Sequence, residues 1–378
     1  MKTNHFFTFC FIIILVFTSC KKDKSDDLTP NSYVCNYSYS NLTFNSQITT
    51  LSPGGNLQTA IENAPSGNII ELEPGTYQYV ELRNVHKTKY TLIRNKGNGV
   101  VKLTDIYYHL DMRKCSYLIF DGITFDGGGR GVYMLNCDHI ILINCEMMNM
   151  QQEGIQVQQD SKFVDIVKCK IHDTGKTNAK YGEGIYVGTA GQYDSNGDGT
   201  KDKYDHTSRV WIEYCEIFNT GHGDGINFKG DVSESTIIGC HIHDIAPGTY
   251  DQANEGAINL EAVIDKSSIS RRNNFVEYCI IENISGGFVG NAAGGYNNAN
   301  FNNGVALFGA GNTIQNNLIN NCSNFGIHGN SFENQASLVN YVSNNTYTGC
   351  SKDVDIDAEI NISNAAFANP FKNQLESK

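Results

Sequence analysis

The chain has 378 residues, enough to bury a large core as one elongated domain or as two compact ones. It carries 28 Lys and Arg residues against 40 Asp and Glu residues, a net charge of −12. This balance argues against nucleic acids and anionic membrane surfaces as partners. An anionic substrate would need a metal cation to bridge it to the protein.

The first residues, "MKTNHFFTFCFIIILVFTSC", contain an apolar run that is short for a membrane span, and they predict a secretory signal over residues 1–19. The "FTSC" junction resembles a bacterial lipobox, which implies cleavage before Cys20, lipidation of its thiol and a surface-exposed lipoprotein of the outer membrane. Such a protein would touch the membrane through its lipid only. A plain signal peptide with an incidental cysteine is the alternative. Residues 20–50 are interpreted as a polar tether and the first irregular strands.

From about residue 55 the sequence repeats in units of 22 to 25 residues, longer where loops are inserted. Each unit contains a short segment with the same alternation of apolar and polar residues. These segments are "GVYML" at 131, "GIQVQ" at 154, "GIYVG" at 184, "GINFK" at 225, "GAINLE" at 256, "GVALF" at 304 and "FGIHG" at 325.

A second series places a cysteine at one register of successive units, with asparagine continuing it. The members are Cys145, Cys169, Cys215, Cys240, Cys279, Asn316 and Asn345. Cysteines in register on parallel strands point the same way, which suits stacking better than disulfide bonding. Most are therefore predicted to be unpaired, buried side chains.

Units this small cannot bury their own apolar face, so they must stack. The sequence predicts an all-β protein, a single-stranded right-handed parallel β-helix over residues 51–365 followed by a tail at 366–378. Leu57, Ala60, Ile61 and Ala64 predict a helix that caps its open end. The stretch "NLQTAIENAPSGNIIELEPGTY" resembles the opening of the pectate-lyase-like β-helix superfamily, whose fold serves several reactions and also adhesion. A monomer is expected.

In "GINFK", Ile226 and Phe228 should face the core, which leaves Asn227 and Lys229 facing solvent. The equivalent outward positions of neighbouring units include Tyr186, Asn259 and Glu261. An acid precedes each of these strands: Glu153, Glu183, Asp224 and Glu255. Stacked like charges are better tolerated around a cation, so Ca²⁺ is expected at or beside Glu183, Asp224 and Glu255, although a solvated acidic edge is the alternative.

Carboxylates alone would keep Lys229 protonated, whereas calcium among them would favour the free amine. The segment "GDGINFKGD" resembles the lysine strand of calcium-dependent pectate lyases and of alginate and dermatan lyases. The resemblance implies β-elimination from a uronic acid polymer with Lys229 as base, near Asp224 and Glu261. A surface lysine that balances its acidic neighbours is the alternative. Alginate and dermatan lyases of this fold carry an arginine where this chain has Glu261, and only Arg271 and Arg272 follow nearby. Substrate contacts are expected from the side chains of Tyr186, Asn227, Asn259, Arg271 and Arg272.

A second calcium site is predicted in the inserted segment "DSNGDGTKDKYD", residues 194–205, which resembles the calcium loop of dockerin repeats. Positions 1, 3, 5, 7, 9 and 12 of this loop are held by Asp194, Asn196, Asp198, Thr200, Asp202 and Asp205. A metal-free turn rich in Asp, Asn and Gly is the alternative.

The histidines are less informative. His172 and His243 recur in "KIHDTG" and "HIHDIA" and are interpreted as structural residues in turns, whereas His222 lies beside Asp224 and is a candidate acid or base. The Gly- and Asn-rich segment 284–303 contains three aromatic residues that suit polysaccharide binding, or it is a loop with incidental aromatics.

The function expected is a calcium-assisted lyase acting on an extracellular polysaccharide. Two alternatives stay open: a glycoside hydrolase with paired acids such as Asp224 with Glu261 or Glu183 with Glu255, and a surface protein that binds glycan without catalysis.

Overall fold

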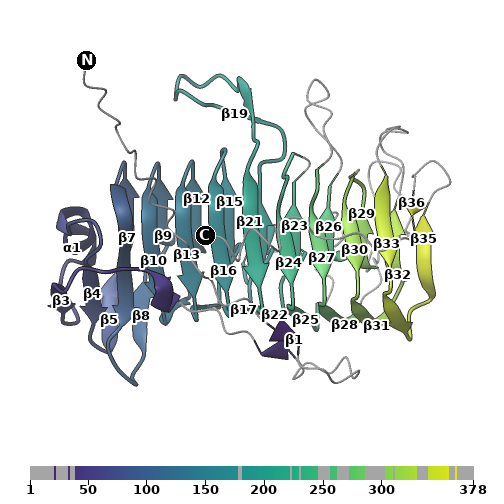
Figure 1. Ribbon diagram of the computed structural model, residues 1–378, viewed down its shortest axis with the longest axis horizontal. Helices are drawn as coiled ribbons and strands as arrows, with labels where there is room; N and C mark the ends of the chain where they lie inside the picture. Colours follow the sequence, from purple (N-terminus) through teal and green to yellow (C-terminus); the bar gives the residue numbers. More distant parts are fainter. Residues whose placement is uncertain are drawn as a thin grey trace, which may run out of the picture. The chain divides into compact units, whose positions relative to one another are not determined.

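The computed structural model describes residues 21–22, 33–34, 39–177, 181–221, 224–229, 231–245, 256–261, 272–285, 303–309, 311–329, 339–356 and 362–363. The chain divides into two units. The first comprises residues 1–43 and 368–378, in which β1 (Lys21–Lys22) and β2 (Tyr33–Val34) pair antiparallel and a short 3₁₀ turn spans Tyr39–Asn41. The second unit, residues 44–367, is a stack of parallel coils (Figure 1).

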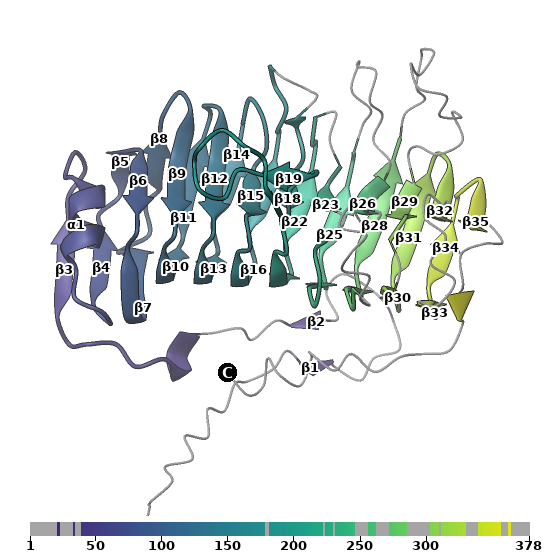
Figure 2. The same cartoon turned by 90° about the horizontal axis from the view of Figure 1, so that it is seen from above.

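The coils of the second unit contribute their strands to three parallel sheets, which run along the stack (Figure 2). Within the described residues, sheet 1 contains β3 (Ile48–Leu51), β4 (Ile69–Leu72), β7 (His86–Asn95), β10 (Ser116–Asp121), β13 (Asp138–Ile143), β16 (Lys162–Val167), β21 (Ser208–Glu213), β24 (Thr236–Ile238), β27 (Phe275–Glu277), β30 (Thr313–Gln315), β33 (Asn340–Ser343) and β36 (Ile362–Ser363).

The strands of sheets 2 and 3 follow in the same order. Sheet 2 contains β5 (Gly75–Gln78), β8 (Val101–Thr104), β11 (Ile123–Asp126), β14 (Glu146–Met148), β17 (Lys170–His172), β22 (Glu216–Phe218), β25 (His241–His243), β28 (Ile280–Ile284), β31 (Leu318–Cys322) and β34 (Thr346–Thr348). Sheet 3 contains β6 (Val80–Arg83), β9 (Tyr108–Arg113), β12 (Arg130–Leu135), β15 (Ile155–Gln158), β18 (Ile185–Val187), β23 (Ile226–Phe228), β26 (Gly256–Leu260), β29 (Asn303–Leu307), β32 (Phe325–Gly329) and β35 (Lys352–Ile356). A hairpin of β19 (Gln192–Tyr193) and β20 (Lys203–Tyr204) projects from one coil.

The predicted parallel β-helix is confirmed, and all seven alternating segments of the sequence lie in sheet 3. The core consists of ladders of identical register, because in-register parallel strands place like positions above one another. In sheet 2 one such ladder runs through Met147, Ile171, Ile217, Ile242, Ile281 and Ile319, all fully buried.

Helix α1 (Leu57–Asn63) lies at the end of the stack beside β3 and β4 (Figure 1). The Asn56 side chain caps it by accepting a hydrogen bond from the amide of Thr59 at 2.9 Å. Leu57 and Ile61 are buried in the core, so the predicted apolar stripe covers the first coil.

The cysteine ladder is present, and the nine described cysteines are all free thiols, as predicted. The predicted continuation is wrong by one residue, because Asn317 rather than Asn316 occupies the ladder position of the coil after Cys279. The Oδ1 atom of Asn317 accepts a hydrogen bond from the amide of Cys279 at 2.9 Å, and Asn345 stands in the same relation to Asn317. Asn316 instead occupies the left-handed corner between sheets 1 and 2, with φ 59°, where the preceding coil has Tyr278 at φ 55°.

Among the described residues, no helix combines the length and apolar character that crossing a membrane requires.

Candidate functional site

The outer face of sheet 3 carries a continuous row of aligned side chains across successive coils. From β12 to β32 the row is Tyr133, Gln156, Tyr186, Asn227, Asn259, Ala306 and His328. Ile226 and Phe228 pack in the core, so Asn227 and Lys229 face outward, as the alternation predicts. They do not reach open solvent, however, because Asn227 is 2% exposed and the Lys229 side chain 12%.

Lys229 forms an ion pair with Glu261 of the next coil, and its Nζ atom lies 4.8 Å from the centre of the Tyr186 ring. Burial disfavours the ammonium charge, but Glu261, Tyr186 and Glu183 more than offset burial and hold the pKa of Lys229 above its ordinary value. Lys229 is therefore a cation in this arrangement. Burial also raises the pKa of the Tyr186 hydroxyl, which keeps its proton.

The acids that precede the strands form a buried column. Backbone hydrogen bonds from Gly154 to Glu183 and from Gly184 to Asp224, each of 3.1 Å, place Glu153, Glu183 and Asp224 on successive coils. They are 1%, 7% and 6% exposed, so a solvated acidic edge is ruled out for these three. Glu153 is neutralised by Arg130, whose Nε atom lies 2.7 Å from its carboxylate.

Glu183 and Asp224 have strongly perturbed acidities. Burial, with the charge of Glu153, raises the pKa of Glu183 to about 8 against the attraction of Lys229. Burial raises the pKa of Asp224 to about 6, opposed by Lys229 and by a hydrogen bond from Asn259. Two titratable acids and a buried ammonium in one cluster are typical of a functional site.

Asn227 connects the two acids that flank Lys229. Its Nδ2 atom donates to Asp224 at 2.8 Å and to Glu261 at 3.2 Å. The two accepting oxygen atoms are therefore no more than about 6 Å apart, closer than the separation of about 6.5–9.5 Å used by inverting glycosidases.

Two buried oxygen atoms of this cluster, Oε2 of Glu183 and Oδ1 of Asn227, have no hydrogen-bond partner. Carboxylate and amide oxygens are the ligands that calcium prefers, so the donor set fits the expected ion. Glu255, the third expected ligand, lies outside the described residues, as do His222, Arg271, Cys20 and most of the segment 284–303.

Two of the acids near Lys229 in sequence are engaged elsewhere. Asp231 forms an ion pair of 2.7 Å with Arg272, and both side chains are 4% exposed. The expectation that Arg272 contacts substrate is therefore wrong, since its guanidinium lies buried against Asp231. Glu234 pairs with Arg209 at 2.7 Å.

The loop at 194–205 is organised by its own acids. Asp194 accepts hydrogen bonds from the amides of Gly197 and Gly199, each at 2.7 Å, while Asp202 accepts from Ser195. Asp205 is different: it is 2% exposed and accepts five hydrogen bonds, from the amides of Gln159, Asp160 and Thr207 and the hydroxyls of Thr189 and Thr207. Asp205 thus anchors the base of the loop to the coils, which is not the ligand role expected for it.

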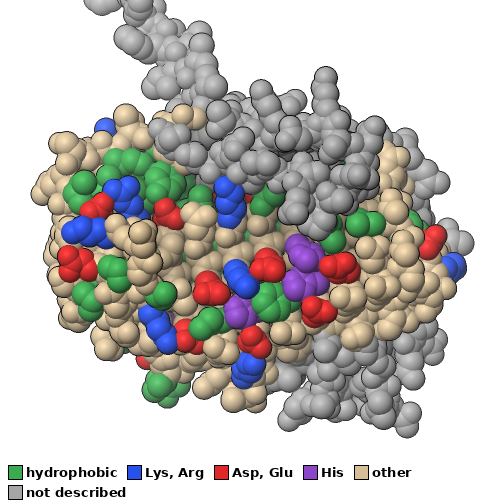
Figure 3. Space-filling view, turned by 90° about the horizontal axis from the view of Figure 1, so that it is seen from below, with side chains coloured by type: hydrophobic (Ala, Val, Ile, Leu, Met, Phe, Trp, Pro, Cys, Tyr) green, Lys and Arg blue, Asp and Glu red, His purple; other side chains and the backbone are tan. Residues whose placement is uncertain are grey.

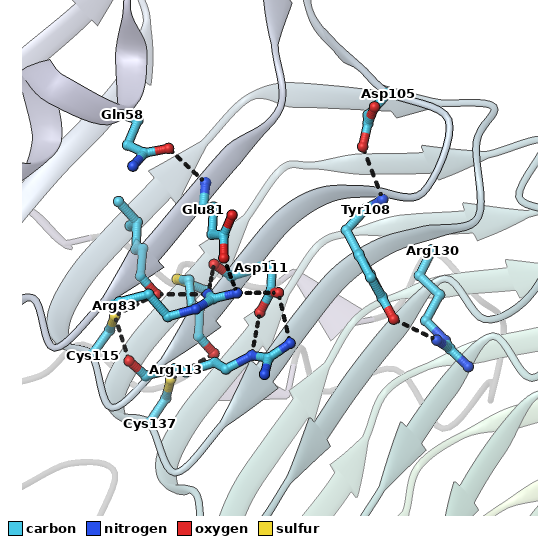
Figure 4. Close-up of polar contacts among 12 residues, drawn as sticks. Gln58, Glu81, Arg83, Asp105, Tyr108, Asp111, Arg113, Cys115, Arg130 and Cys137 are labelled. Atoms are coloured by element: carbon cyan, nitrogen blue, oxygen red, sulfur yellow. Dashed lines mark hydrogen bonds and ion pairs between the residues drawn. The ribbon is translucent and has the colours of Figure 1, made fainter. Parts of the chain in front are cut away.

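Sequence reasoning missed a cluster of arginines and tyrosines nearer the N-terminus on the same face of sheet 3 (Figure 4). Arg113 contacts Asp111 through two nitrogen atoms at 3.1 and 3.2 Å, and the Tyr108 and Tyr133 rings stack at 5.4 Å. The guanidinium carbons of Arg113 and Arg130 lie 5.9 and 5.8 Å from the centre of the Tyr133 ring. The signal was available in "YHLDMR" and "RGVYML", where alternation turns Asp111 and Tyr133 to one face.

Comparisons with known proteins agree with this architecture. A family model described as "Right handed beta helix region" matches residues 68–197. No curated protein sequence matches the chain.

Solved structures of similar fold include an alginate lyase from Paenibacillus sp. str. FPU-7, with 18% identity, a TM-score of 0.64 and coverage of 83% of this chain and 99% of that chain. The Geobacillus virus E2 protein ORF18 matches with 14% identity and a TM-score of 0.52, covering 79% of this chain and 55% of that chain. The pectate lyase Pel9A matches with 13% identity and a TM-score of 0.43, covering 86% and 80%. Three stacked parallel sheets, the matching family model and the likeness to the alginate lyase together place the chain, by its fold, among the right-handed parallel β-helix proteins.

Proposed function

We propose that this protein is a polysaccharide lyase that cleaves a uronic-acid-containing polymer by β-elimination, with Lys229 as the base. One observation carries the proposal: a buried lysine on the outer face of sheet 3 lies among Glu261, Glu183 and Asp224, beside the Tyr186 ring. At 18% identity, the likeness to an alginate lyase speaks to the fold alone. The reaction is therefore argued from this cluster.

β-Elimination breaks the bond between C5 of the uronate and its hydrogen, forms a C4–C5 double bond and expels the oxygen at C4. It needs a neutralised uronate carboxylate, a group that accepts the C5 proton and a group that protonates the leaving oxygen. Tyr186 keeps its proton and suits donation to the leaving oxygen.

Lys229 is the proposed acceptor of the C5 proton. It becomes competent when the negative charge around it falls, because that charge holds its pKa above the ordinary value. A calcium ion held by Glu183, Asp224 and Asn227 would neutralise the substrate carboxylate and lower the pKa of Lys229. We place a second, structural calcium ion in the loop 194–202, where Asp194, Asn196, Asp198, Thr200 and Asp202 supply oxygen atoms.

The arginine and tyrosine cluster extends the proposed binding surface. It lies three strand spacings from the Lys229 coil, about 14 Å along the stack at about 4.8 Å a strand. The Arg113 side chain is 45% exposed and can contact a carboxylate of the polymer, while Tyr133 offers a flat apolar surface to a sugar ring. We further propose export and lipid anchoring through Cys20, which would place this surface outside the cell.

A glycoside hydrolase is the second candidate. Asp224, with its pKa raised to about 6, suits a general acid, and Glu261, ion-paired with Lys229, suits the nucleophile. Their oxygen atoms lie within about 6 Å of one another, which suits the retaining geometry.

The test is the ultraviolet absorbance of unsaturated uronate after incubation of purified protein with a panel of uronic acid polymers, with calcium and with a chelator. Calcium-dependent absorbance that is lost in Lys229→Met supports the proposal. The matched control is Lys102→Met, which removes another ion-paired lysine, on sheet 2, and should leave activity intact.

Other outcomes separate the alternatives. New reducing ends without ultraviolet absorbance, abolished in Asp224→Asn, would replace the lyase by the hydrolase. Binding of a polymer without product, unchanged in Lys229→Met, would reduce the function to glycan binding.

A further inference from the structure

The outer face of sheet 2 carries a cluster of histidine and acidic side chains that is separate from the Lys229 site. Histidines gather there beside acidic residues (Figure 3). His241 and His243 are two residues apart on β25, so they face the same side, and Glu216 of β22 aligns with His241. Among the described residues, Glu216, His241 and His243 form the group whose possible ligand atoms all lie within 4.8 Å of one another.

His243 is held in the orientation that metal-binding histidines adopt. Its Nδ1 atom lies 2.8 Å from a carboxylate oxygen of Asp244, which can only accept a hydrogen bond. In the neutral ring the proton is therefore on Nδ1, and the lone pair of Nε2 is free. A carboxylate behind a histidine in this way fixes the tautomer and makes the other nitrogen a better metal ligand.

The free lone pair of His243 faces Glu216. The Nε2 atom lies 3.4 Å from Oε1 of Glu216, longer than the 2.7–2.9 Å or so of a charged hydrogen bond. Two ligands about 2.0–2.1 Å from a tetrahedral zinc ion are about 3.3 Å apart, so this spacing suits a shared ion.

Charge and access also suit a divalent cation. Oε1 of Glu282 on β28 lies 2.8 Å from Nε2 of His241, which brings a second carboxylate to the cluster. The two carboxylates offset the charge of a divalent ion between the imidazoles. The Lys170 ammonium lies 3.5 Å from Oε2 of Glu216, which leaves Oε1, the oxygen that faces His243, for the ion. The side chains of Glu216, His241 and His243 are 43%, 31% and 15% exposed, so an ion can reach them.

We propose that Glu216, His241 and His243 bind a divalent transition metal of the zinc type and so clamp β22 to β25. Imidazole nitrogen with a carboxylate suits zinc, whereas the all-oxygen sites proposed above suit calcium. The site is independent of the proposed lyase function.

The repeat supplies an internal control. His172 on β17 has Nδ1 2.7 Å from Asp173 and Nε2 3.4 Å from Glu146, the same arrangement two coils earlier. The position that corresponds to His241 is held there by Lys170, which aligns with Glu146 as His241 aligns with Glu216. This earlier copy therefore lacks the second imidazole and should not bind.

The test is titration of chelator-stripped, purified protein with Zn²⁺ by calorimetry and with Co²⁺ by visible absorption. We expect one equivalent with the absorption of four-coordinate cobalt, and excess Ca²⁺ should not displace it. His241→Lys introduces the residue that the other copy tolerates, so it should fold and lose at least about tenfold in affinity, as should Asp244→Asn. Lys170→His should add a second equivalent.

Absence of saturable binding by the unaltered protein would overturn the proposal, as would unchanged affinity in His241→Lys. A folded Lys170→His protein that still binds one equivalent would show that this geometry does not suffice for binding.

Discussion

Glu183 offers a sharp test of the buried acid column, because its ionisation and the stability of the fold are linked. Its pKa rises from 4.5 to about 8 on folding. At about 1.4 kcal/mol for each tenfold change in acidity, ionising Glu183 in the folded protein costs about 4–5 kcal/mol more than in the unfolded chain. Since the folded state binds this proton more tightly, its contribution to stability is full below pH 4.5 and is lost as the pH rises to 8.

The perturbation is Glu183→Gln, which keeps the shape and removes the charge. In a chelating buffer, the denaturant needed to unfold the unaltered protein should fall between pH 5 and 8, and the variant should show a flatter profile and greater stability at pH 8. The fluorescence of Trp211, the single tryptophan and 1% exposed, reports unfolding. Glu73→Gln, at a side chain 42% exposed, is the control that should not change the profile.

Calcium adds a second measurement to the same experiment. An ion bound at Glu183 should restore the stability of the unaltered protein at pH 8 and should have less effect on Glu183→Gln. Parallel pH profiles for the unaltered protein and the variant, in the chelator, would refute the burial of an ionisable group here. Equal stabilisation of both proteins by calcium would place the ion elsewhere.

Three further predictions concern other parts of the molecule. Ile217→Ala, in the centre of a fully buried ladder, should lower the free energy of unfolding by about 2–5 kcal/mol in denaturant titrations, whereas Phe218→Ala on the outer side of the same strand should cost less. Asp205→Ala removes the acceptor of five hydrogen bonds and should make the loop before it a preferred site of limited proteolysis, while Asp202→Ala should not destabilise the coils below. Arg113→Ala should raise KM for a polyanionic substrate and leave kcat within about twofold, and an equal fall in kcat would contradict a role confined to binding.

The fold was predictable from the sequence because many repeat units carry the same pattern. The same alternation of apolar and polar residues recurs in each unit, so the other units correct a wrong assignment in one. All the alternating segments lie in one sheet. The error at Asn316 arose where two adjacent asparagines both fit the ladder by type. The hydrogen bond between Asn317 and the amide of Cys279 decides between them, and composition cannot show it.

For the candidate site, the sequence predicted which way the side chains point but not how deeply they are buried. Alternation turned Asn227 outward correctly, yet whether an outward residue is exposed depends on its neighbours, and Asn227 is buried. The sequence also did not show which ion pairs form between coils. Lys229 pairs with Glu261, 32 residues away, whereas Asp231, two residues away, pairs with Arg272. Loops of variable length separate the coils, so sequence distance does not report such contacts.

The cysteine ladder also bears on the order in which the coils fold. The Sγ atoms of Cys169, Cys215 and Cys240 donate to the carbonyls of Leu142, Ile166 and Ile212, at 3.6, 3.4 and 3.5 Å, and each of these carbonyls belongs to the preceding coil. Each of these three thiols therefore bonds backward, to chain that has already been synthesised. Assembly can proceed from the capped N-terminal end, each turn docking on a finished template as it emerges, without waiting for the C-terminus.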